Sequence, residues 1–469
     1  MDQPLVTPYK DLHIRYNVKG SYYTAYPPSG LWSEQFTDTD YRQALTTILT
    51  ETPDLPLQLY IHFPYCVQQC YYCQCFQLVT NNKDRLREIV DALIGEIGML
   101  RLLFAQSGIT PQFKEIHLGG GSPSYLEMDE FDRLVDAVST IATIETVEEF
   151  AIEIDPRTVT QENLKHYNSK GINRISFGIQ ELDPDIQKAI NRIQPIEQIE
   201  ELLQLRGLFK GVNFDLLYGL PLQTRESLRK TLEKIILLSP DRIALSVLGY
   251  RPDVFKHNQK IQESDLPEFI ERTAMWEESL GFFLDNGYER IGMDHFAKPE
   301  DELAIAKKEN RLFRNSMGYS PGRFQDNVSI GPSAMTRMTN YYFQNTYSIS
   351  DYCSNIAQGV FPVIRGYSLN KDDLIRRSIM NELMTYYRLD IQVLEHIYKI
   401  DFRDYFKPEI TSLQEFVDAK LLVITPSAFN VTLFGNFFLR NICMVFDNLG
   451  LEYKHNIESG MAKKICDKQ

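Results

Sequence analysis

The chain carries Cys66-Val67-Gln68-Gln69-Cys70-Tyr71-Tyr72-Cys73-Gln74-Cys75 directly after an alternating apolar run, Leu57 to Phe63, which predicts a strand. Four of the seven cysteines therefore lie within ten residues. A disulfide set would need an oxidising compartment, and nothing in the sequence is typical of a secreted protein. Zinc would need a second Cys or His pair well separated from the first, and none follows. An iron–sulfur cluster is favoured, because its irons lie close enough together to share one tight loop. A zinc site or chance clustering are the alternatives.

The spacing of these cysteines is CxxxCxxC, which offers three thiolates at Cys66, Cys70 and Cys73. A four-iron cluster held in this way keeps one iron without a protein ligand. A small molecule can bind and react at such an open iron, so the loop predicts a reactive metal centre. The remaining cysteines, Cys353, Cys443 and Cys466, are scattered along the chain and are expected to be inert.

The CxxxCxxC loop after a first strand resembles the signature of the radical SAM enzymes. The fourth cysteine, Cys75, and the preceding Tyr60-Ile61-His62-Phe63-Pro64 are similar to the oxygen-independent coproporphyrinogen III oxidase (coproporphyrinogen dehydrogenase) family. The resemblance runs from about Tyr22 to the C-terminal region. It implies a [4Fe-4S] cluster on the three spaced cysteines, with S-adenosylmethionine (SAM) chelating the open iron. It also implies that the fourth cysteine lies near the cluster without being a ligand.

Predicted strands and helices alternate from residue 57 to residue 286, which indicates parallel strands joined by right-handed crossovers. The predicted strands are Leu57–Phe63, Phe113–Leu118, Glu149–Ile154, Asn173–Gly178, Val212–Tyr218 and Arg242–Leu248. Six such units predict an α/β fold, a partial (β/α)6 barrel, and the family resemblance implies the radical SAM barrel. Functional residues are then expected beyond the C-terminal ends of the strands.

The sequence predicts three segments: an N-terminal arm (1–55), the barrel core (56–340) and a C-terminal, mainly helical domain of winged-helix-like type (341–469). Within the arm, Asp11 to Pro28 is expected to be irregular and Thr39 to Thr50 helical. The strand–helix alternation stops after about residue 340. A hairpin is expected from Leu421–Pro426 and Phe429–Leu433, followed by a final helix at Phe437–Asn448.

The net charge of −14 argues against nucleic-acid binding as the main function. No apolar run reaches the roughly 18 residues of a membrane helix, so no membrane span is expected. The N-terminus, Met1-Asp2-Gln3-Pro4, lacks the basic and apolar regions of a signal peptide. We therefore expect a cytoplasmic, reducing setting, which suits thiolate ligands. We also expect a monomer.

Gly119-Gly120-Gly121-Ser122 follows the second predicted strand. Such a loop can be a plain turn, because glycine adopts positive φ without steric cost. Three successive glycines instead favour close approach of the backbone to a ligand, and in radical SAM enzymes this loop receives the amino group of SAM. Glu153 lies at the third strand end, where a buried carboxylate is rare unless it is paired. A structural salt bridge is the alternative role for Glu153. The resemblance implies that the first SAM is bound by Tyr60, Gly120, Glu153 and Met335.

Gln180, Arg192 and Asp215 belong to the region of the fourth and fifth strands, and a solvated loop would explain any one of them. Together with the intact Asn191-Arg192-Ile193-Gln194-Pro195, they match the family's positions for a second SAM. In that match Arg192 pairs with a carboxylate in bidentate fashion, and Asp215 holds a cationic or hydroxyl group. The resemblance implies a second site made of Tyr72, Gly121, Ser122, Gln180, Arg192, Asp215 and Gly249.

Gly292-Met293-Asp294-His295-Phe296-Ala297 matches a further block of the same family. A single histidine is more often a satisfied interior residue, but the adjacent pair Asp294-His295 could orient substrate or relay protons. Arg290 and Arg314-Asn315 could neutralise substrate carboxylates.

Two segments depart from the family pattern. Ser21-Tyr22-Tyr23-Thr24-Ala25-Tyr26-Pro27 has Tyr22 where the family has arginine. Val247-Leu248-Gly249-Tyr250-Arg251-Pro252 replaces Asn-Tyr-Ala-His-Leu-Pro. We interpret both segments as regions that touch substrate, in which Arg251 could restore a lost positive charge.

The resemblance implies anaerobic oxidative decarboxylation of two propionate side chains of coproporphyrinogen III, which yields protoporphyrinogen IX for haem biosynthesis. A flavodoxin or ferredoxin would supply the electron, and a 5′-deoxyadenosyl radical would take hydrogen from the β-carbon. One alternative is a divergent radical SAM enzyme that uses two SAM molecules for methylation or tetrapyrrole modification. A haem chaperone is another, although Cys75 argues against it, and a zinc-binding module is the third.

Overall fold

The structure is a computed structural model, and it describes residues 10–16, 18, 23, 25–315, 317–322 and 325–448. The chain divides into two compact units, which are described separately. Among the described residues, the larger unit contains 33–275 and 325–368. The smaller unit contains the described residues up to 32 together with 276–322 and 369–448. Within these ranges, every helix is too short or too polar to cross a membrane.

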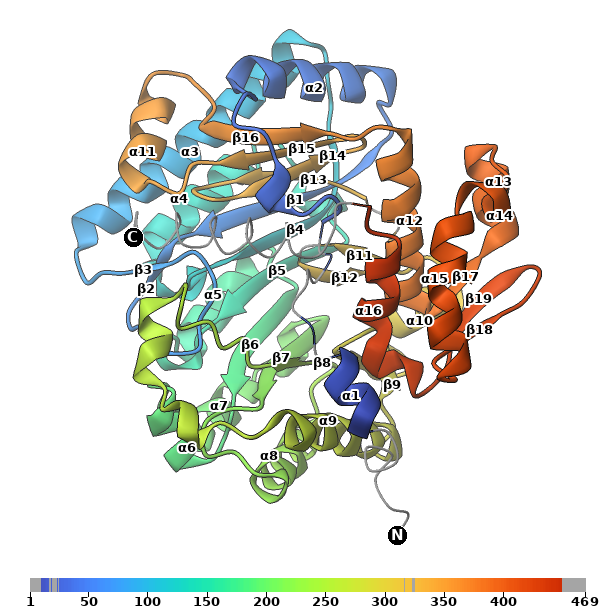
Figure 1. The fold of residues 1–469 in the computed structure, drawn as a ribbon. Coiled ribbons are helices and arrows are strands. Elements are labelled where there is room, and N and C mark those ends of the chain that lie inside the picture. The colour runs from blue at the N-terminus through green and yellow to red at the C-terminus, as the bar shows by residue number, and fades with distance from the viewer. Residues whose placement is uncertain are drawn as a thin grey trace. The chain divides into compact units, whose positions relative to one another are not determined.

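A mostly parallel sheet forms the larger unit, and its strands lie in the order β16-β15-β14-β13-β1-β4-β5-β6-β7-β8 (Figure 1). The six predicted strands are present as a continuous parallel run from β1 to β8, so the predicted α/β, partial-barrel fold is confirmed. The strands are β1 (Pro56–Phe63), β4 (Gln112–Gly120), β5 (Glu149–Ile154), β6 (Arg174–Gln180), β7 (Gly211–Tyr218), β8 (Arg242–Val247), β13 (Asp326–Ile330), β14 (Met335–Met338), β15 (Tyr341–Asn345) and β16 (Val363–Ser368).

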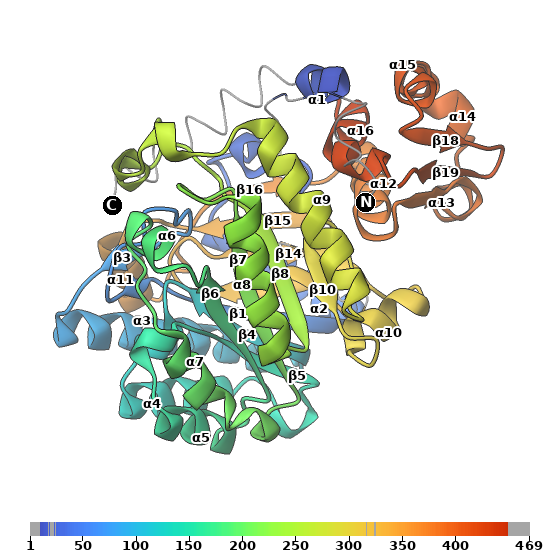
Figure 2. The same ribbon diagram turned by 90° about the horizontal axis from the view of Figure 1, so that it is seen from below.

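Crossover helices connect the parallel strands, and α4, α5 and α7 lie along one side of them (Figure 2). Thr160 and Thr224 begin two of these helices with capping boxes, and the Asn82 side chain accepts hydrogen bonds from the first turn of α3. The helices are α2 (Asp38–Glu51), α3 (Lys83–Gln106), α4 (Met128–Val138), α5 (Gln161–Ser169), α6 (Pro184–Ala189), α7 (Ile196–Leu203), α8 (Arg225–Leu238), α9 (Phe269–Asp285), which contains the point of division, and α11 (Ile349–Ala357).

The sheet continues beyond β1 in a way that the sequence did not indicate. Strand β13 pairs in parallel with β1, and β14, β15 and β16 extend the sheet in antiparallel fashion. Residues 341–368 therefore belong to the larger unit, whereas the prediction assigned them to a C-terminal helical domain. These strands bury polar side chains that bond to one another, such as Arg365 Nε to Gln344 Oε1 at 2.8 Å, so they lack a clear apolar alternation.

Glu96 in α3 connects four elements of this sheet edge. Its side chain is 1% exposed and accepts hydrogen bonds from the Gly331 amide (2.9 Å), the Asn345 amide (2.9 Å) and the Tyr352 hydroxyl (2.5 Å). Gly331 follows β13 with φ +107°, and a Cβ there would lie 2.4 Å from the His62 carbonyl oxygen, so only glycine fits. Burial raises the pKa of Glu96 to about 7, although the three donors act in the opposite direction.

We expect the free energy of unfolding to fall as pH rises from about 5 to about 8, because the Glu96 pKa is raised in the folded protein. Such a group stabilises the fold fully below its unfolded pKa, and that contribution is lost as pH rises through the folded pKa. The loss is at most about 3 kcal/mol. Glu96→Gln keeps the shape and removes the charge, so its unfolding free energy should vary less between these pH values. Urea denaturation at both pH values measures this, with Glu226→Gln on the exposed face of α8 as control. Equal pH dependence in wild type and Glu96→Gln would contradict the prediction.

In the smaller unit, residues 276–322 form short antiparallel pairs instead of another strand–helix unit. Strand β9 (Glu289–Arg290) pairs with β10 (His295–Ala297), and β11 (Phe313–Asn315) pairs with β12 (Gly318–Ser320). Helix α10 (Glu302–Lys308) lies between the two pairs in the chain. The predicted boundary at residue 340 therefore differs from the division of the chain, because these residues pack with the C-terminal ones.

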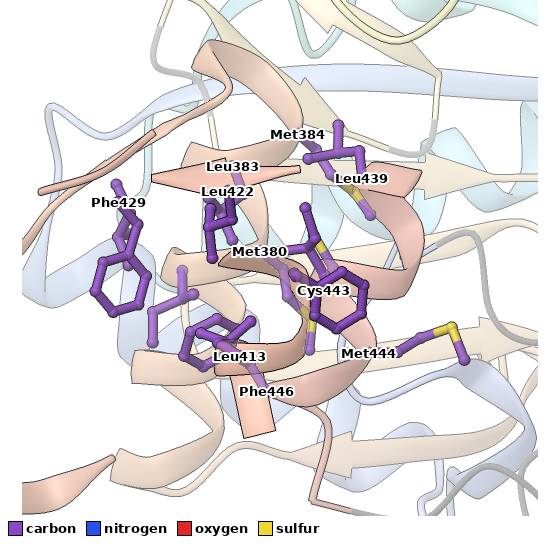
Figure 3. Close-up of a cluster of buried hydrophobic side chains, with 14 of the residues drawn as sticks. Met380, Leu383, Met384, Leu413, Leu422, Phe429, Leu439, Cys443, Met444 and Phe446 are labelled. Carbon is purple, nitrogen blue, oxygen red and sulfur yellow. The ribbon is translucent and has the colours of Figure 1, made fainter. Parts of the chain in front are cut away.

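The C-terminal part of this unit contains the predicted hairpin, β18 (Leu422–Ile424) and β19 (Ala428–Val431), to which β17 (Arg388–Asp390) adds a third antiparallel strand. The helices are α12 (Lys371–Tyr386), α13 (Ile391–Tyr398), α14 (Phe402–Tyr405), α15 (Lys407–Asp418) and α16 (Leu439–Val445). Their apolar side chains form one core, which includes Met380, Leu413, Phe429, Cys443 and Phe446 (Figure 3). Burial raises the pKa of Cys443 to about 12, as expected of an inert thiol.

The prediction of an irregular arm from Asp11 to Pro28 is wrong at its start, where α1 (Lys10–Tyr16) is helical. Tyr16 stacks on Phe416, with ring centroids 4.9 Å apart, so residues distant in the chain fix this short helix. Sequence periodicity alone cannot show such support. Tyr22, the departure noted above, lies outside the described residues.

Candidate active site

The predicted functional residues of the larger unit gather at one edge of its sheet, because parallel strands present their carboxyl ends on the same side. The cysteine loop follows β1, the glycine loop ends β4 and Glu153 lies near the end of β5. Gln180 ends β6, and Met335 begins β14 after the turn from β13. The order of the strands therefore places the two predicted SAM sites and the cysteines on a common edge.

A separate two-stranded sheet closes the base of the cysteine loop. Cys66 ends β2 (Tyr65–Cys66), which pairs in parallel with β3 (Leu78–Val79). The Cys73 amide donates to the Cys70 carbonyl at 3.3 Å, which turns the loop back on itself. Cys70 is buried, Cys66 and Cys73 are partly exposed, and Cys75 is exposed. Burial, followed by the neighbouring Cys70 thiol, raises the pKa of Cys66.

Two other loops hold the backbone of the cysteine loop. Asn191 Nδ2 donates to the Gln69 carbonyl at 2.7 Å, and Asn258 Nδ2 donates to the Tyr71 carbonyl at 2.6 Å. His257 Nε2 donates to the Cys73 carbonyl at 2.5 Å. These three hydrogen bonds hold the backbone between Gln69 and Cys73, so Asn191, Asn258 and His257 position the part of the loop that carries Cys70 and Cys73.

The segment that departs from the family after β8 also contacts the cysteine loop. Gln74 Nε2 donates to the Gly249 carbonyl, and a Cβ on Gly249 would lie 2.6 Å from that Gln74 amide. The Arg251 amide donates to Asn258 Oδ1 at 2.9 Å, and the Arg251 guanidinium pairs with Asp253. The unusual residues of this segment therefore have partners within the protein. Their interpretation as substrate contacts stays a prediction.

Two arginines face the sulfur of Cys70, and Asp155 contacts both of them. Arg192 Nη1 lies 3.6 Å and Arg157 Nη2 lies 3.8 Å from the Cys70 Sγ. Asp155 Oδ2 accepts from Arg157 Nη2 at 2.6 Å and lies 3.4 Å from Arg192 Nη1. Burial alone would raise the pKa of Asp155, but the guanidinium groups of Arg192 and Arg157 lower it. This group can therefore carry charge beside a cysteine thiolate.

Arg192 does not present the open fork that a bidentate carboxylate contact requires. Its Nη2 donates to the Gly178 carbonyl at 2.5 Å, while Nη1 faces Cys70 and Asp155. Its buried Nε has no hydrogen-bond partner among the described residues. A single acceptor at Nε fits this arrangement better than the predicted bidentate contact.

Glu153 belongs to a second hydrogen-bonded group. Its Oε1 accepts from His117 Nε2 at 3.0 Å, and its Oε2 accepts from the Gly120 amide at 3.3 Å. The His117 ring stacks on Tyr60 with centroids 5.8 Å apart. The Tyr60 hydroxyl donates to Nδ1 of His62 at 3.1 Å, because His62 Nε2 must donate to the Phe76 carbonyl at 2.8 Å. Burial would lower the pKa of His117, but its hydrogen bond to Glu153 raises it.

The glycine loop is folded onto these residues. A Cβ on Gly120, whose φ is +111°, would lie 2.7 Å from the His62 ring. The Gly121 and Ser122 amides donate to the carbonyls of Phe63 and Tyr65, at 2.7 and 2.9 Å. The amino group of SAM is a hydrogen-bond donor and would bind to backbone carbonyls of this loop. Because the loop amides are already bonded within the protein and the predicted contact does not need them, the loop is compatible with that contact.

The remaining residues of the two predicted SAM sites lie on strands of the sheet or, in the case of Tyr72, in the cysteine loop. Asp215 accepts from the Ser176 hydroxyl and from Asn213 Nδ2, both at 2.8 Å. Gln180, at the end of β6, has φ +66°, a backbone conformation that is rare for residues other than glycine. Tyr72 packs on an apolar group that includes Ile186, Leu220 and Leu248, and the Met335 carbonyl accepts from Ser329 Oγ at 2.7 Å.

The Asp294-His295 pair lies in the smaller unit, where His295 Nδ1 is 2.7 Å from Asp294 Oδ1 and its ring packs edge-on against Tyr319. Arg290 lies over the Tyr387 ring at 4.6 Å and donates to the Gly292 carbonyl. Arg314 donates to the Tyr23 carbonyl at 2.8 Å. Each predicted substrate contact in this unit therefore has a partner of its own.

Sequence reasoning missed Arg157, His117, His257 and Asn258. A signal for His117 exists, because polar residues recur at every second position of the barrel strands. Such positions are Gln58, Tyr60 and His62 in β1, Glu115 and His117 in β4, Glu149 and Glu153 in β5, Ser176 in β6, and Asn213 and Asp215 in β7. Alternate residues of a strand face the same side of the sheet. The polar residues at these alternate positions therefore predict one polar face of the sheet, on which His117 lies.

The residues present fit a [4Fe-4S] cluster with bound SAM. In the part of the chain that the structure describes, no three His, Cys, Asp or Glu side chains converge as the ligands of one metal ion would. Such convergence is not needed here, because each thiolate of a four-iron cluster binds a different iron. The unpartnered Nε of Arg192 offers a donor that an anionic cofactor group would satisfy.

Comparison with known proteins extends these observations over the whole chain. The model of the Radical SAM superfamily matches residues 60–235. The oxygen-independent coproporphyrinogen III oxidase of Salmonella typhimurium is 35% identical over 435 residues, which cover 92% of this chain and 93% of that protein. The Synechocystis protein of the same name is 34% identical over 443 residues, or 93% of this chain and 94% of its own.

The crystal structure of coproporphyrinogen III oxidase from Escherichia coli, a radical SAM enzyme, is also similar. It shares 35% sequence identity and a TM-score of 0.86, covering 91% of this chain and 97% of that one. Because the identity exceeds 30% over nearly the full length of both chains, this protein belongs to the oxygen-independent coproporphyrinogen III oxidase family of radical SAM enzymes.

Proposed function

We propose that this enzyme converts coproporphyrinogen III to protoporphyrinogen IX by anaerobic oxidative decarboxylation of two propionate side chains. The observation that carries the proposal is the match to coproporphyrinogen III oxidases over 92% of the chain. The cysteine loop, whose backbone is held by Asn191, His257 and Asn258, supports it, because a radical SAM enzyme needs three fixed thiolates. Membership of the family implies a [4Fe-4S] cluster and SAM, and we propose that each chain uses two SAM molecules.

The proposed roles follow the groups of residues at the sheet edge. Cys66, Cys70 and Cys73 hold the cluster. Glu153, fixed by His117, receives the first SAM. The first SAM is bound by Tyr60, Gly120, Glu153 and Met335, and the second by Tyr72, Gly121, Ser122, Gln180, Arg192, Asp215 and Gly249.

When bound, the cluster and SAM supply one-electron cleavage of the sulfonium and abstraction of a hydrogen atom. From each propionate the β-carbon loses one hydrogen atom, which ends in 5′-deoxyadenosine, and the side chain gives one electron to an external one-electron acceptor. The carboxylate leaves as carbon dioxide and a vinyl group remains. The chain's own residues bind the reactants, orient them and exclude water. Asp215, held by Ser176 and Asn213, is arranged to accept a hydroxyl or a cationic group.

We further propose a flavodoxin or ferredoxin as electron donor and a monomer that acts in the cytoplasm. The partly exposed thiols of Cys66 and Cys73 support this location, because a reducing compartment keeps such thiols available as ligands. Neither nucleic acid nor membrane is part of the proposed function, in line with the net charge of −14.

Anaerobic turnover tests the proposal directly. The protein is reconstituted with iron and sulfide and is then incubated with SAM, a low-potential reductant and coproporphyrinogen III. We expect protoporphyrinogen IX, with two carbon dioxide and two 5′-deoxyadenosine molecules released per product. A methylated tetrapyrrole would instead establish the divergent two-SAM enzyme, which the altered Val247–Arg251 segment favours. Haem transfer without any 5′-deoxyadenosine would establish the chaperone.

A further inference from the structure

We propose that Arg157 is a positioning residue for the cluster, and that Arg157, Asp155 and Arg192 together set how readily the cluster accepts an electron. These three residues are called the Cys70 triad below. The inference rests on the proposed function in one respect, because it takes Cys70 to be a cluster ligand. It adds a role for a residue that no sequence motif indicated.

The geometry of the Cys70 triad is that of a charged group directed at one sulfur. Two guanidinium groups approach the Cys70 Sγ, with nitrogen–sulfur distances of 3.6 Å from Arg192 and 3.8 Å from Arg157. The Asp155 carboxylate lies between the two arginines and contacts both. The side chains are 8% to 13% exposed, so water screens these charges poorly.

Arg157 is fixed for this task by further contacts. Its Nε donates to Asp155 Oδ1 at 2.9 Å and its backbone amide donates to the same oxygen at 3.1 Å. Its Nη1 donates to Gln68 Oε1 at 3.3 Å, and Gln68 Nε2 donates to Asn191 Oδ1 at 2.9 Å. Arg157 therefore links the end of β5 to the cysteine loop and to the Asn191-Arg192 segment.

The charges predict a direction for the effect. An oxidised [4Fe-4S]²⁺ core with three thiolates carries a net charge of −1, and one added electron makes it −2. A nearby positive charge stabilises the second state more than the first, so Arg157 and Arg192 favour reduction. Asp155 opposes them. The triad carries two positive charges and one negative charge, and its net effect makes reduction easier.

A purely structural salt bridge predicts something different. If the triad only held the loop in place, removal of either charge would loosen the loop, and any change in potential would have no fixed sign. If the charges act on the cluster, loss of Arg157 and loss of Asp155 must shift the reduction potential in opposite directions. The signs of the two shifts therefore separate the two roles.

The experiment uses the full chain, reconstituted anaerobically, and compares wild type with Arg157→Gln, Arg157→Lys and Asp155→Asn. Arg229→Gln, which removes an exposed arginine of α8, is the matched control. Iron and sulfide contents are measured first. The reduction potential is then read from the electron paramagnetic resonance signal of the reduced cluster during a redox titration, without substrate.

For Arg157→Gln we expect the reduced cluster to be disfavoured about tenfold, which is about −59 mV for one electron. Asp155→Asn keeps an acceptor for the Arg157 amide. This variant should favour the reduced cluster by a similar factor. Arg157→Lys keeps the charge and should stay within about threefold of wild type, as should the Arg229→Gln control.

Shifts of the same sign in Arg157→Gln and Asp155→Asn, or no shift in either, would overturn the inference. If Arg157→Gln fails to hold iron, the sign of the Asp155→Asn shift and the unchanged potential of Arg157→Lys decide the question. A wild-type protein that binds no iron and sulfide would refute the proposed function itself, which is a separate outcome.

Discussion

Alanine in place of Cys66, Cys70 or Cys73 is expected to remove the iron and sulfide from the reconstituted protein and to abolish SAM cleavage. Each of these residues is taken to bind a different iron, so alanine at any one of them removes one of the three protein ligands of the cluster. We expect the iron content to fall below about a tenth of the wild-type value and the rate of 5′-deoxyadenosine release to fall by about 1,000-fold or more. Iron and sulfide assays, visible absorbance near the thiolate-to-iron charge-transfer region, and chromatography of the nucleoside measure the three quantities.

Cys75→Ala provides the matched control, because Cys75 lies two residues after Cys73 and is exposed. This variant should keep its iron and sulfide and a measurable rate of SAM cleavage. Cys353→Ala, which removes a partly exposed thiol of α11, should resemble wild type in both respects. Full iron content in Cys70→Ala, or complete loss of iron in Cys75→Ala, would mean that the ligand set is assigned incorrectly.

The barrel could be predicted from the sequence because its signals are local. Phe150, Ile152 and Ile154 alternate with Glu149, Ala151 and Glu153 in one short strand, and a helix with clear caps follows. Each parallel strand repeats this pattern, and parallel strands place their carboxyl ends on one edge. The cysteine loop and the glycine loop carry spacing signals of their own. These signals were sufficient for the fold and for the expectation that the candidate site residues lie at one edge of the sheet.

The contacts that complete the site could not be predicted in the same way. Asn258 lies 187 residues from its partner Tyr71, and Arg157 lies 87 residues from Cys70. Neither residue type is unusual in its local sequence, so only the folded chain shows the pairing. Strands β13 to β16 were missed for a related reason. Their buried residues include Asn327, which donates to the Met335 carbonyl, and Arg365, which donates to Gln344, so polar groups replace the apolar alternation there.

The segment after β8 illustrates how structure changes an interpretation. From the sequence alone, its departure from the family pattern indicates altered substrate contacts. In the structure, Gly249 is close to Gln74, and the Arg251 amide is held by Asn258, which also holds Tyr71. A change in this segment can therefore act on the position of the cysteine loop. Substitutions there should be judged by iron content as well as by the choice of substrate.

Glu153→Ala is expected to weaken SAM binding by about 100-fold while the iron content stays at the wild-type level. Glu153 is fixed by His117 and by the Gly120 amide, so its carboxylate is already oriented for a cationic or hydroxyl group of the first SAM. Removal of one partner of such a charged, partly buried contact typically costs about 3 kcal/mol, which corresponds to about 100-fold in affinity. Calorimetric titration of SAM into the reconstituted protein measures the affinity.

His117 should show a smaller effect, because it acts on SAM only through Glu153. His117→Ala removes the donor to Glu153 Oε1 and the ring that stacks on Tyr60, so we expect about a tenfold loss of SAM affinity. His117→Gln, which can still donate to the carboxylate, should recover part of that loss, and a role limited to packing would not show this rescue. Glu226→Ala, which removes an exposed carboxylate paired with Lys230, is the control for the loss of one negative charge. If Glu153→Ala binds SAM as tightly as this control does, then Glu153 has only a structural role. The first SAM would in that case have to be held by other groups at the sheet edge.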